Sequence, residues 1–192
     1  ALRRRYSSRS TRVGRSMHTH DKALTFDVVA GTPNYHTSVI GDASDMAEAI
    51  ELCFPMETDD AEMLWHGIRV PISYKYDLSV IFEDVVDMLR SCLDSQSTCV
   101  HFGSNTFSGS LTIDPLGSDL RVLGKWESVA GSREEELNAA SHLVTSRTHF
   151  LKAWSEPLRR AANAVRASNL RLRLEAELDD LQRLLDRIEK LS

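Results

Sequence analysis

Histidine is the side chain best suited to proton transfer near neutral pH, and the sequence holds seven histidines. It contains no H-x-x-x-H, H-E-x-x-H or D-x-D pattern, so we expect no metal site. His101 and His142 fall in two short apolar runs, with Glu127 between them in the sequence. If the fold joined these side chains, they would suit a metal-free hydrolase or lyase. Solvent-facing histidines on separate strands are the simpler interpretation, and we expect no catalytic residue and no cofactor.

Carboxylates are the second chemically active group, because they are concentrated in one part of the chain. Positions 42 to 94 hold thirteen acidic and three basic residues, whereas the whole chain has a net charge of −5. Such a run is commonly a solvated face, but it also attracts a basic partner at a rate that falls with salt. We therefore take six carboxylates as candidate contacts with a basic protein: Asp59, Asp60, Glu62, Glu83, Asp84 and Asp87.

The three cysteines, Cys53, Cys92 and Cys99, form no C-x-x-C pair and have no histidine at zinc-ligand spacing. We expect all three to be reduced, buried thiols in a cytoplasmic protein. No apolar stretch approaches the ~20 residues that cross a bilayer, so we expect a soluble chain without a membrane span.

Residues 1–22 differ from the rest of the chain in charge, with seven basic residues and one acid. This Arg- and Ser-rich composition is found in mitochondrial presequences and in arms that bind nucleic acid. A third interpretation, which we favour, takes Met17 as the start of the protein. We expect disorder there in each case. Because the remaining chain is acidic, the folded domain is not expected to bind nucleic acid.

The elements that must position these side chains begin with an expected hairpin over residues 24–41, built about a Thr-Pro-Asn turn. A helix capped by Asp42 or Ser44 follows and closes at Pro55. The inward side chains of the hairpin are expected to be Phe26, Val28, Tyr35 and Val39.

The next segment, Trp65–Tyr76, has the character of a strand with an edge or an interruption at Pro71. The clearest helix of the chain covers residues 77–94, with Asp77 or Ser79 as its cap. Its wide apolar stripe requires a sheet beneath it. Three of the candidate carboxylates lie away from that stripe: Glu83, Asp84 and Asp87.

The stretch from Thr98 to Arg147 predicts an antiparallel meander, because short apolar runs alternate with turn-forming residues. Gly109 falls where a strand would bulge or approach another backbone closely. Such a sheet has one face to cover, and the flanking helices have the apolar faces to cover it. The predicted fold class is therefore α+β. The four runs are Cys99–Phe102, Phe107–Ile113, Leu120–Trp126 and Leu143–Thr145.

The C-terminal part predicts two helices. In the first, after Thr148, Pro157 indicates a kink or a restart beyond Trp154. The second carries a heptad-like leucine stripe, which either pairs with a copy of itself or docks back on the same domain. The predicted organisation is a basic segment (1–22), a single α+β domain (23–168) and a leucine-rich helix (169–192).

Five short motifs in this order resemble small immunity proteins of bacterial polymorphic toxin systems, over residues 24–166. The resemblance implies a non-enzymatic protein that binds and blocks a cognate toxin, often a nuclease. The acidic residues would then face a basic toxin domain, in place of phosphates. The motifs are W-x-G-I-x-V-P-I from Trp65, F-G-S from Phe102, G-S-L from Gly109, W-E-S-V-A-G from Trp126 and F-L-K-A-W from Phe150.

Three functions follow from the sequence. The first is an immunity-type inhibitor that binds a basic partner through the six candidate carboxylates. The second is a scaffold that self-associates, as a homodimer, through the leucine-rich helix. The third is the metal-free enzyme that would use His101 and His142. The first is our main expectation.

Overall fold

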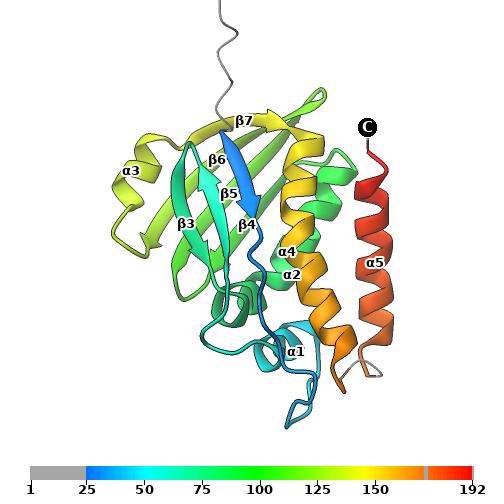
Figure 1. Cartoon of the computed structure of the whole chain (residues 1–192). Helices are drawn as coiled ribbons and strands as arrows, with labels where there is room; N and C mark the ends of the chain where they lie inside the picture. The colour runs from blue at the N-terminus through cyan, green and yellow to red at the C-terminus, as the bar shows by residue number, and fades with distance from the viewer. Residues whose placement is uncertain (1–24, 171–172, 192) are drawn as a thin grey trace, which may run out of the picture.

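The computed structural model describes residues 25–170 and 173–191, which form two antiparallel sheets and their helices (Figure 1). The basic segment over residues 1–22 lies outside the described residues. The predicted α+β class is confirmed. The smaller sheet contains β1 (Phe26–Val29), β2 (Ala61–Trp65) and β3 (Ile68–Ile72), and the larger contains β4 (Thr98–Gly103), β5 (Phe107–Leu116), β6 (Asp119–Val129) and β7 (His142–Ser146). The helices are α1 (Met46–Cys53), η1 (Tyr74–Leu78), α2 (Ser79–Leu93), α3 (Glu134–Ala139), α4 (Arg147–Ala167) and α5 (Glu175–Glu189).

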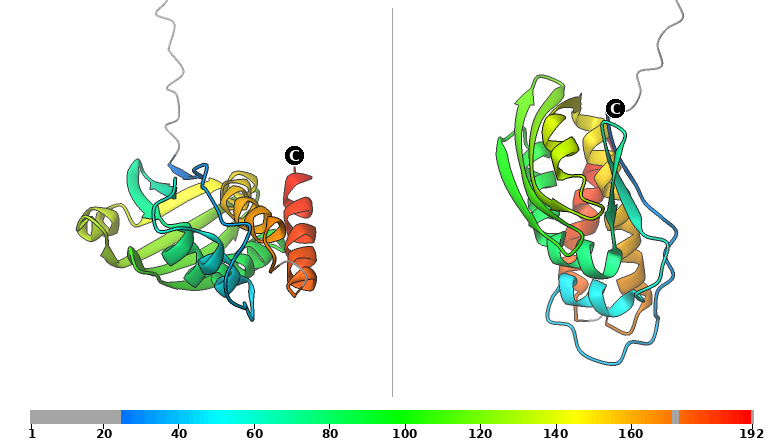
Figure 2. Two further views of the ribbon diagram at one scale, coloured as in Figure 1. Left: turned by 60° about the horizontal axis from the view of Figure 1, so that its bottom comes forward. Right: turned by 90° about the vertical axis from the view of Figure 1, so that its left-hand side faces the viewer.

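The larger sheet is the predicted meander, with β4 to β7 side by side in chain order. Its inner face is covered by α2, by α4 and by the smaller sheet, and its outer face is open (Figure 2). The helical cover predicted from the sequence is therefore confirmed, with a second sheet added to it. The close approach expected at Gly109 is also confirmed: the register shifts there, and a Cβ would lie 2.3 Å from the Lys125 carbonyl oxygen.

Aromatic side chains join the two sheets and α4 in one core. The rings of Trp65 and Trp126 meet edge to face, with centroids 5.4 Å apart, and Phe26 stacks on Phe150 at 4.8 Å. Gly124 on β6 makes room for the tryptophan pair, because a Cβ there would lie 2.8 Å from Trp126 Nε1. This packing fixes the smaller sheet against the larger one.

The hairpin predicted over residues 24–41 is wrong, because only β1 forms and it pairs with β2. The residues after β1 are held by isolated bonds to distant partners instead of a strand ladder. The side chain of Asn169 accepts the N–H of Val39 at 2.9 Å and donates to its carbonyl at 3.1 Å. Tyr35, expected to point inward, is 42% exposed, whereas the two expected members on β1 are buried.

The single strand predicted over residues 65–76 is also wrong, because this segment turns back after Trp65. His66 and Gly67 have φ angles of 49° and 81°, and two successive positive φ angles make the tight turn between β2 and β3. Pro71 lies on β3, at the edge of the smaller sheet, as expected for a residue that cannot donate to a ladder.

The helix starts differ from the predicted ones. Asp45 caps α1 by accepting the N–H of Glu48 at 2.9 Å, so neither Asp42 nor Ser44 is the cap. Asp77 and Ser79, the two expected caps of α2, accept no hydrogen bond from the N–H groups of its first turn. Helix α2 instead continues directly from the π-helical turn η1. Asp77 lies inside η1 and is fully buried.

The two C-terminal helices lie side by side in Figure 1 and Figure 2. Helix α4 runs through Pro157 as one helix, so the expected restart is absent. Helix α5 docks on α4 and α2, and its stripe is buried there: Leu178, Leu181, Leu184, Leu185 and Ile188. Within the described part of the chain, no helix combines the length and the apolar character that a membrane span requires.

Candidate functional site

The six candidate carboxylates lie on two separate parts of the fold. The β2 carboxylates, at the start of the smaller sheet, are Asp59, Asp60 and Glu62. The α2 carboxylates, on the side of that helix that faces away from the core, are Glu83, Asp84 and Asp87.

The β2 carboxylates are bonded within the protein. Asp59 accepts the N–H of Thr32 at 2.6 Å, and Asp60 accepts the N–H of Tyr74 at 3.0 Å. Glu62 forms an ion pair with Arg69 at 2.9 Å. Burial raises the pKa of Asp60, and the neighbouring carboxylates of Asp77 and Asp59 add to the rise. These carboxylates therefore hold irregular backbone and an edge strand in place.

One of the α2 carboxylates, Glu83, lines a groove where α1, α2 and α5 meet, with a volume of about 170 Å³. Its floor is apolar and its rim carries carboxylates, and we call it the acidic groove. The acidic groove is lined by Met46, Phe82, Glu83, Val86, Arg90, Glu177, Asp180 and Leu181.

Negative charge is crowded around Glu83. Burial raises the pKa of this side chain, and the carboxylates of Asp87, Asp45 and Glu177 raise it further, against the opposing effect of Arg90. Among the described residues, neither Glu83 nor Asp84 forms an ion pair. Such a site favours the binding of a cation, because an added positive charge would relieve the repulsion among the carboxylates.

Arg90 is the one basic residue among those described that lines the acidic groove. Its guanidinium bridges α2 and α5, pairing with Asp87 at 2.9 Å and with Asp180. The carboxylates near the groove still outnumber it. In the described ranges, no group of three or more His, Cys, Asp or Glu side chains could hold a metal ion.

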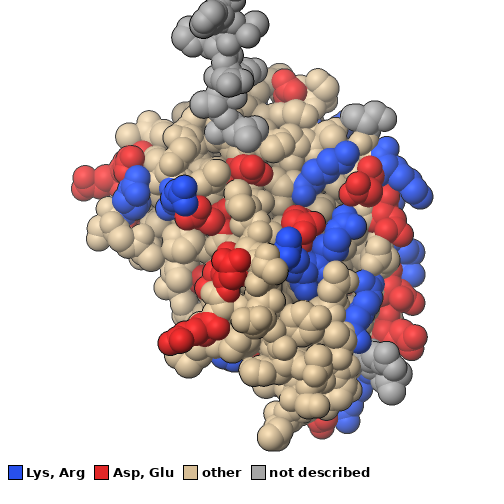
Figure 3. Space-filling model, in the orientation of Figure 1, with Lys and Arg blue, Asp and Glu red and all other residues tan. Residues whose placement is uncertain are grey.

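The seam between α4 and α5 has a different charge pattern. Arg159 on α4 pairs with Glu189 on α5 at 3.2 Å and with Glu156 on its own helix at 3.8 Å, and Arg160 pairs with Glu156 at 3.1 Å. Figure 3 shows this face, with basic and acidic side chains interleaved along the two helices. Charges of both signs meet here, so this seam offers no surface of a single sign.

Three carboxylates of the groove region are not among the sequence candidates: Asp45, Glu177 and Asp180. Their only signal is position beside an apolar residue of an amphipathic helix, which many solvated acids share. Glu177 and Asp180 join Glu83 because α5 docks beside α2, and the sequence left that docking open against dimerisation; Asp45 joins it because α1 packs on α2.

His101 and His142 share the outer face of the larger sheet but lie on its two edge strands, β4 and β7. With β5 and β6 between them, their backbones are about 14 Å apart at the usual strand spacing. Glu127 lies near Lys125, at 3.9 Å. The two histidines therefore form no acid–base pair.

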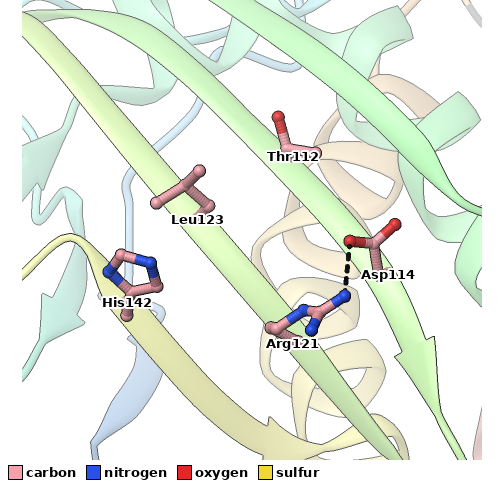
Figure 4. Close-up of a pocket in the computed structure, with 5 residues that line it drawn as sticks. All are labelled: Thr112, Asp114, Arg121, Leu123 and His142. Carbon is pink, nitrogen blue, oxygen red and sulfur yellow. Dashed lines mark hydrogen bonds and ion pairs between the residues drawn. The ribbon is translucent and has the colours of Figure 1, made fainter.

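The outer face also carries a shallow hollow of about 330 Å³ (Figure 4). Strands β5, β6 and β7 supply its lining, in which Arg121 pairs with Asp114 at 3.2 Å. The lining residues are Thr112, Asp114, Arg121, Leu123 and His142.

The cysteines differ from the prediction at one position. Cys53 and Cys92 are buried, as expected, but Cys99 is exposed on the outer face of β4. The strand alternation explains the difference, since Val100 and Phe102 take the inward positions of β4.

No protein-family model matches this sequence, and searches of curated proteins and of solved structures give no match either. The fold and site define a two-sheet α+β domain with an acidic groove.

Proposed function

We propose that this protein is a non-enzymatic, immunity-type inhibitor, which holds a basic segment of a bacterial toxin domain in the acidic groove. The observation that carries the proposal is the crowding of carboxylates around Glu83, over an apolar floor. The proposal includes the cytoplasm as the compartment in which the protein meets its partner.

The composition of the groove supports this choice. Protein interfaces combine an apolar centre with a polar rim, and the groove has both in one small area. A lysine or arginine side chain of a partner would lay its methylene groups on Phe82 and Val86 and its charge near Glu83. The rim then sets the association rate and the choice of partner, more than it sets affinity.

The β2 carboxylates enter the proposal in a smaller role. They are bonded to Thr32, Tyr74 and Arg69, so a partner would contact them only where those bonds leave oxygen lone pairs free. The main contacts are therefore assigned to Glu83 on α2 and to the groove acids of α5, Glu177 and Asp180.

The scaffold alternative gains no support from the described residues. Its leucine stripe on α5 is buried against α4 and α2, which leaves no apolar stripe on that helix for a second copy. The enzyme alternative is not favoured, because strands β5 and β6 separate His101 from His142 on the outer face.

The test is binding to a basic toxin domain encoded beside this gene, measured by isothermal titration calorimetry, and the absence of such a domain would count against the proposal. The double variant Glu83→Lys/Glu177→Lys, which reverses two acids that line the groove, is expected to lose at least about tenfold in affinity, because two contacts become repulsive. The affinity of the wild type is expected to decrease as the salt concentration is raised from about 50 mM to about 500 mM.

The matched control is Glu127→Lys/Glu135→Lys, which reverses two exposed acids on β6 and α3, away from the groove. It is expected to bind like the wild type. Equal losses of affinity in both double variants would overturn the assignment of the groove as the binding site. An affinity that does not change with salt concentration would overturn the proposal of a basic partner.

A further inference from the structure

Cys99 differs from the other two cysteines in its surroundings. Cys53 and Cys92 are fully buried. Burial raises the pKa of the Cys53 thiol and raises that of Cys92 to about 12, which keeps both as unreactive thiols. Cys99 is exposed on β4, the edge strand of the larger sheet.

Two side chains contact the Cys99 sulfur. His101 is two residues further along β4 and so lies on the same face, with its Nε2 3.8 Å from Cys99 Sγ. Thr112 is directly opposite Cys99 on β5, and its hydroxyl donates to Sγ at 3.7 Å. The sulfur therefore has a base to take its proton and a donor to stabilise the resulting thiolate.

The sulfur is connected to the hollow on the outer face through Thr112. Thr112, which contacts Cys99, is part of the lining of that hollow. In strand register, Cys99 is followed across the sheet by Thr112, Leu123 and His142. A molecule bound to Cys99 would thus have a ready-made surface for its organic part, with Leu123 as the apolar contact (Figure 4).

We propose that Cys99 is a thiol–disulfide exchange site that accepts a low-molecular-weight disulfide, with the attached group lying over the hollow. His101 takes the thiol proton, and the thiolate attacks one sulfur of the disulfide. A new bond forms between Cys99 Sγ and that sulfur while the S–S bond of the ligand breaks. The departing thiolate then takes the proton from the His101 imidazolium, so no further oxidant is needed.

This site is independent of the acidic groove. The groove lies beside α2, which covers the inner face of the larger sheet, whereas Cys99 is on the outer face. Either proposal therefore stands if the other fails.

The experiment treats the full chain with oxidised glutathione at pH 7 and measures the adduct by intact-protein mass spectrometry. One glutathionyl group is expected on the native protein, and none on Cys99→Ser. In denaturant, all three cysteines of the wild type are expected to react, which shows that the fold protects the other two. An adduct that persists on native Cys99→Ser would overturn the proposal.

The role of His101 is tested by the rate of the same reaction. His101→Gln is expected to slow it about fivefold at pH 7 and to move the pH of half-maximal rate upward, because the neighbouring base is lost. Both side chains are exposed, and the far-UV circular dichroism of each variant checks the fold. An unchanged rate and pH profile would show a merely exposed thiol and would overturn the assisted site.

The hollow is tested with a second disulfide. Leu123→Ala is expected to slow the reaction with oxidised glutathione about threefold, but to leave the reaction with the smaller 2-hydroxyethyl disulfide unchanged, because only the larger ligand reaches Leu123. If Leu123→Ala reacted with oxidised glutathione as fast as the wild type does, the hollow would have no part in the reaction.

Discussion

The β2 carboxylates and the α2 carboxylates come from the same acidic part of the sequence but differ in what surrounds them. Asp59 and Asp60 each accept a backbone N–H from a segment distant in the chain. Glu83 and Asp84 project from a regular helix whose own N–H groups are already bonded. A carboxylate beside irregular backbone is thus used to build the fold, whereas a carboxylate on a helix surface remains available to a partner.

Asp77 is the extreme case of the first kind. Its carboxylate is fully buried and accepts the N–H of Ser73 at 2.8 Å, the N–H of Thr106 at 2.9 Å and the Thr106 hydroxyl at 2.8 Å. It therefore ties the π-helical turn η1 to the turn between β4 and β5. The burial of this polar side chain is tolerated because three donors converge on it.

The largest effect is expected at Asp77. Asp77→Ala leaves the N–H groups of Ser73 and Thr106 without their acceptor, while the Thr106 hydroxyl keeps the Pro71 carbonyl, and we expect a loss of about 3 kcal/mol in the free energy of unfolding. Urea denaturation followed by circular dichroism measures it. The matched control is Asp84→Ala on α2, expected within about 0.5 kcal/mol of the wild type. Similar losses in both variants would contradict the distinction between the two kinds of carboxylate.

A smaller effect is expected at Asp60. Asp60→Ala leaves the N–H of the buried Tyr74 without an acceptor, and we expect a loss of about 1 kcal/mol. Asp60→Asn keeps an acceptor oxygen and removes the charge that burial disfavours, so its stability at pH 7 is expected to match the wild type. Thermal unfolding of the wild type and the two variants measures these differences in stability. An equal loss of stability in both variants would show that the Tyr74 N–H requires the charge of Asp60 and not merely an acceptor oxygen.

The sequence predicts the larger sheet well because its information is local. Alternating apolar runs, turn residues between them and the small side chain at Gly109 each act within a few positions, and the structure has the meander where they indicate it. The smaller sheet was missed because its pairing is not local. β1 pairs with β2 across more than thirty residues, and the turn at His66 and Gly67 lacks the usual Asn-Gly signal.

The candidate site was predicted in part for the same reason. The α2 carboxylates follow from helix periodicity, which places them opposite the apolar stripe. Their partners in the groove, Glu177 and Asp180, depend on where α5 docks, and a leucine stripe alone fits an intramolecular contact and a dimer equally well. Tertiary docking therefore decides the composition of the site.

The smallest effect, and one of opposite sign, is expected at Glu83. Its folded pKa is raised by burial and by neighbouring carboxylates, so the folded protein binds this proton more tightly than the unfolded chain does. The contribution of Glu83 to the free energy of unfolding therefore decreases as pH rises through the raised pKa. Glu83→Gln removes this penalty and should stabilise the protein at pH 7, by about 0.3 kcal/mol after allowing for solvent screening.

The gain should vanish below about pH 4, where Glu83 is protonated in both states. Thermal unfolding of the two proteins from about pH 3 to about pH 7 measures it. Glu127→Gln on the outer sheet face is the matched control, and because Lys125 lies nearby it should show no gain. If Glu83→Gln were destabilising at pH 7, Arg90 would outweigh the surrounding carboxylates, and the acidic groove would have no excess charge to offer a basic partner.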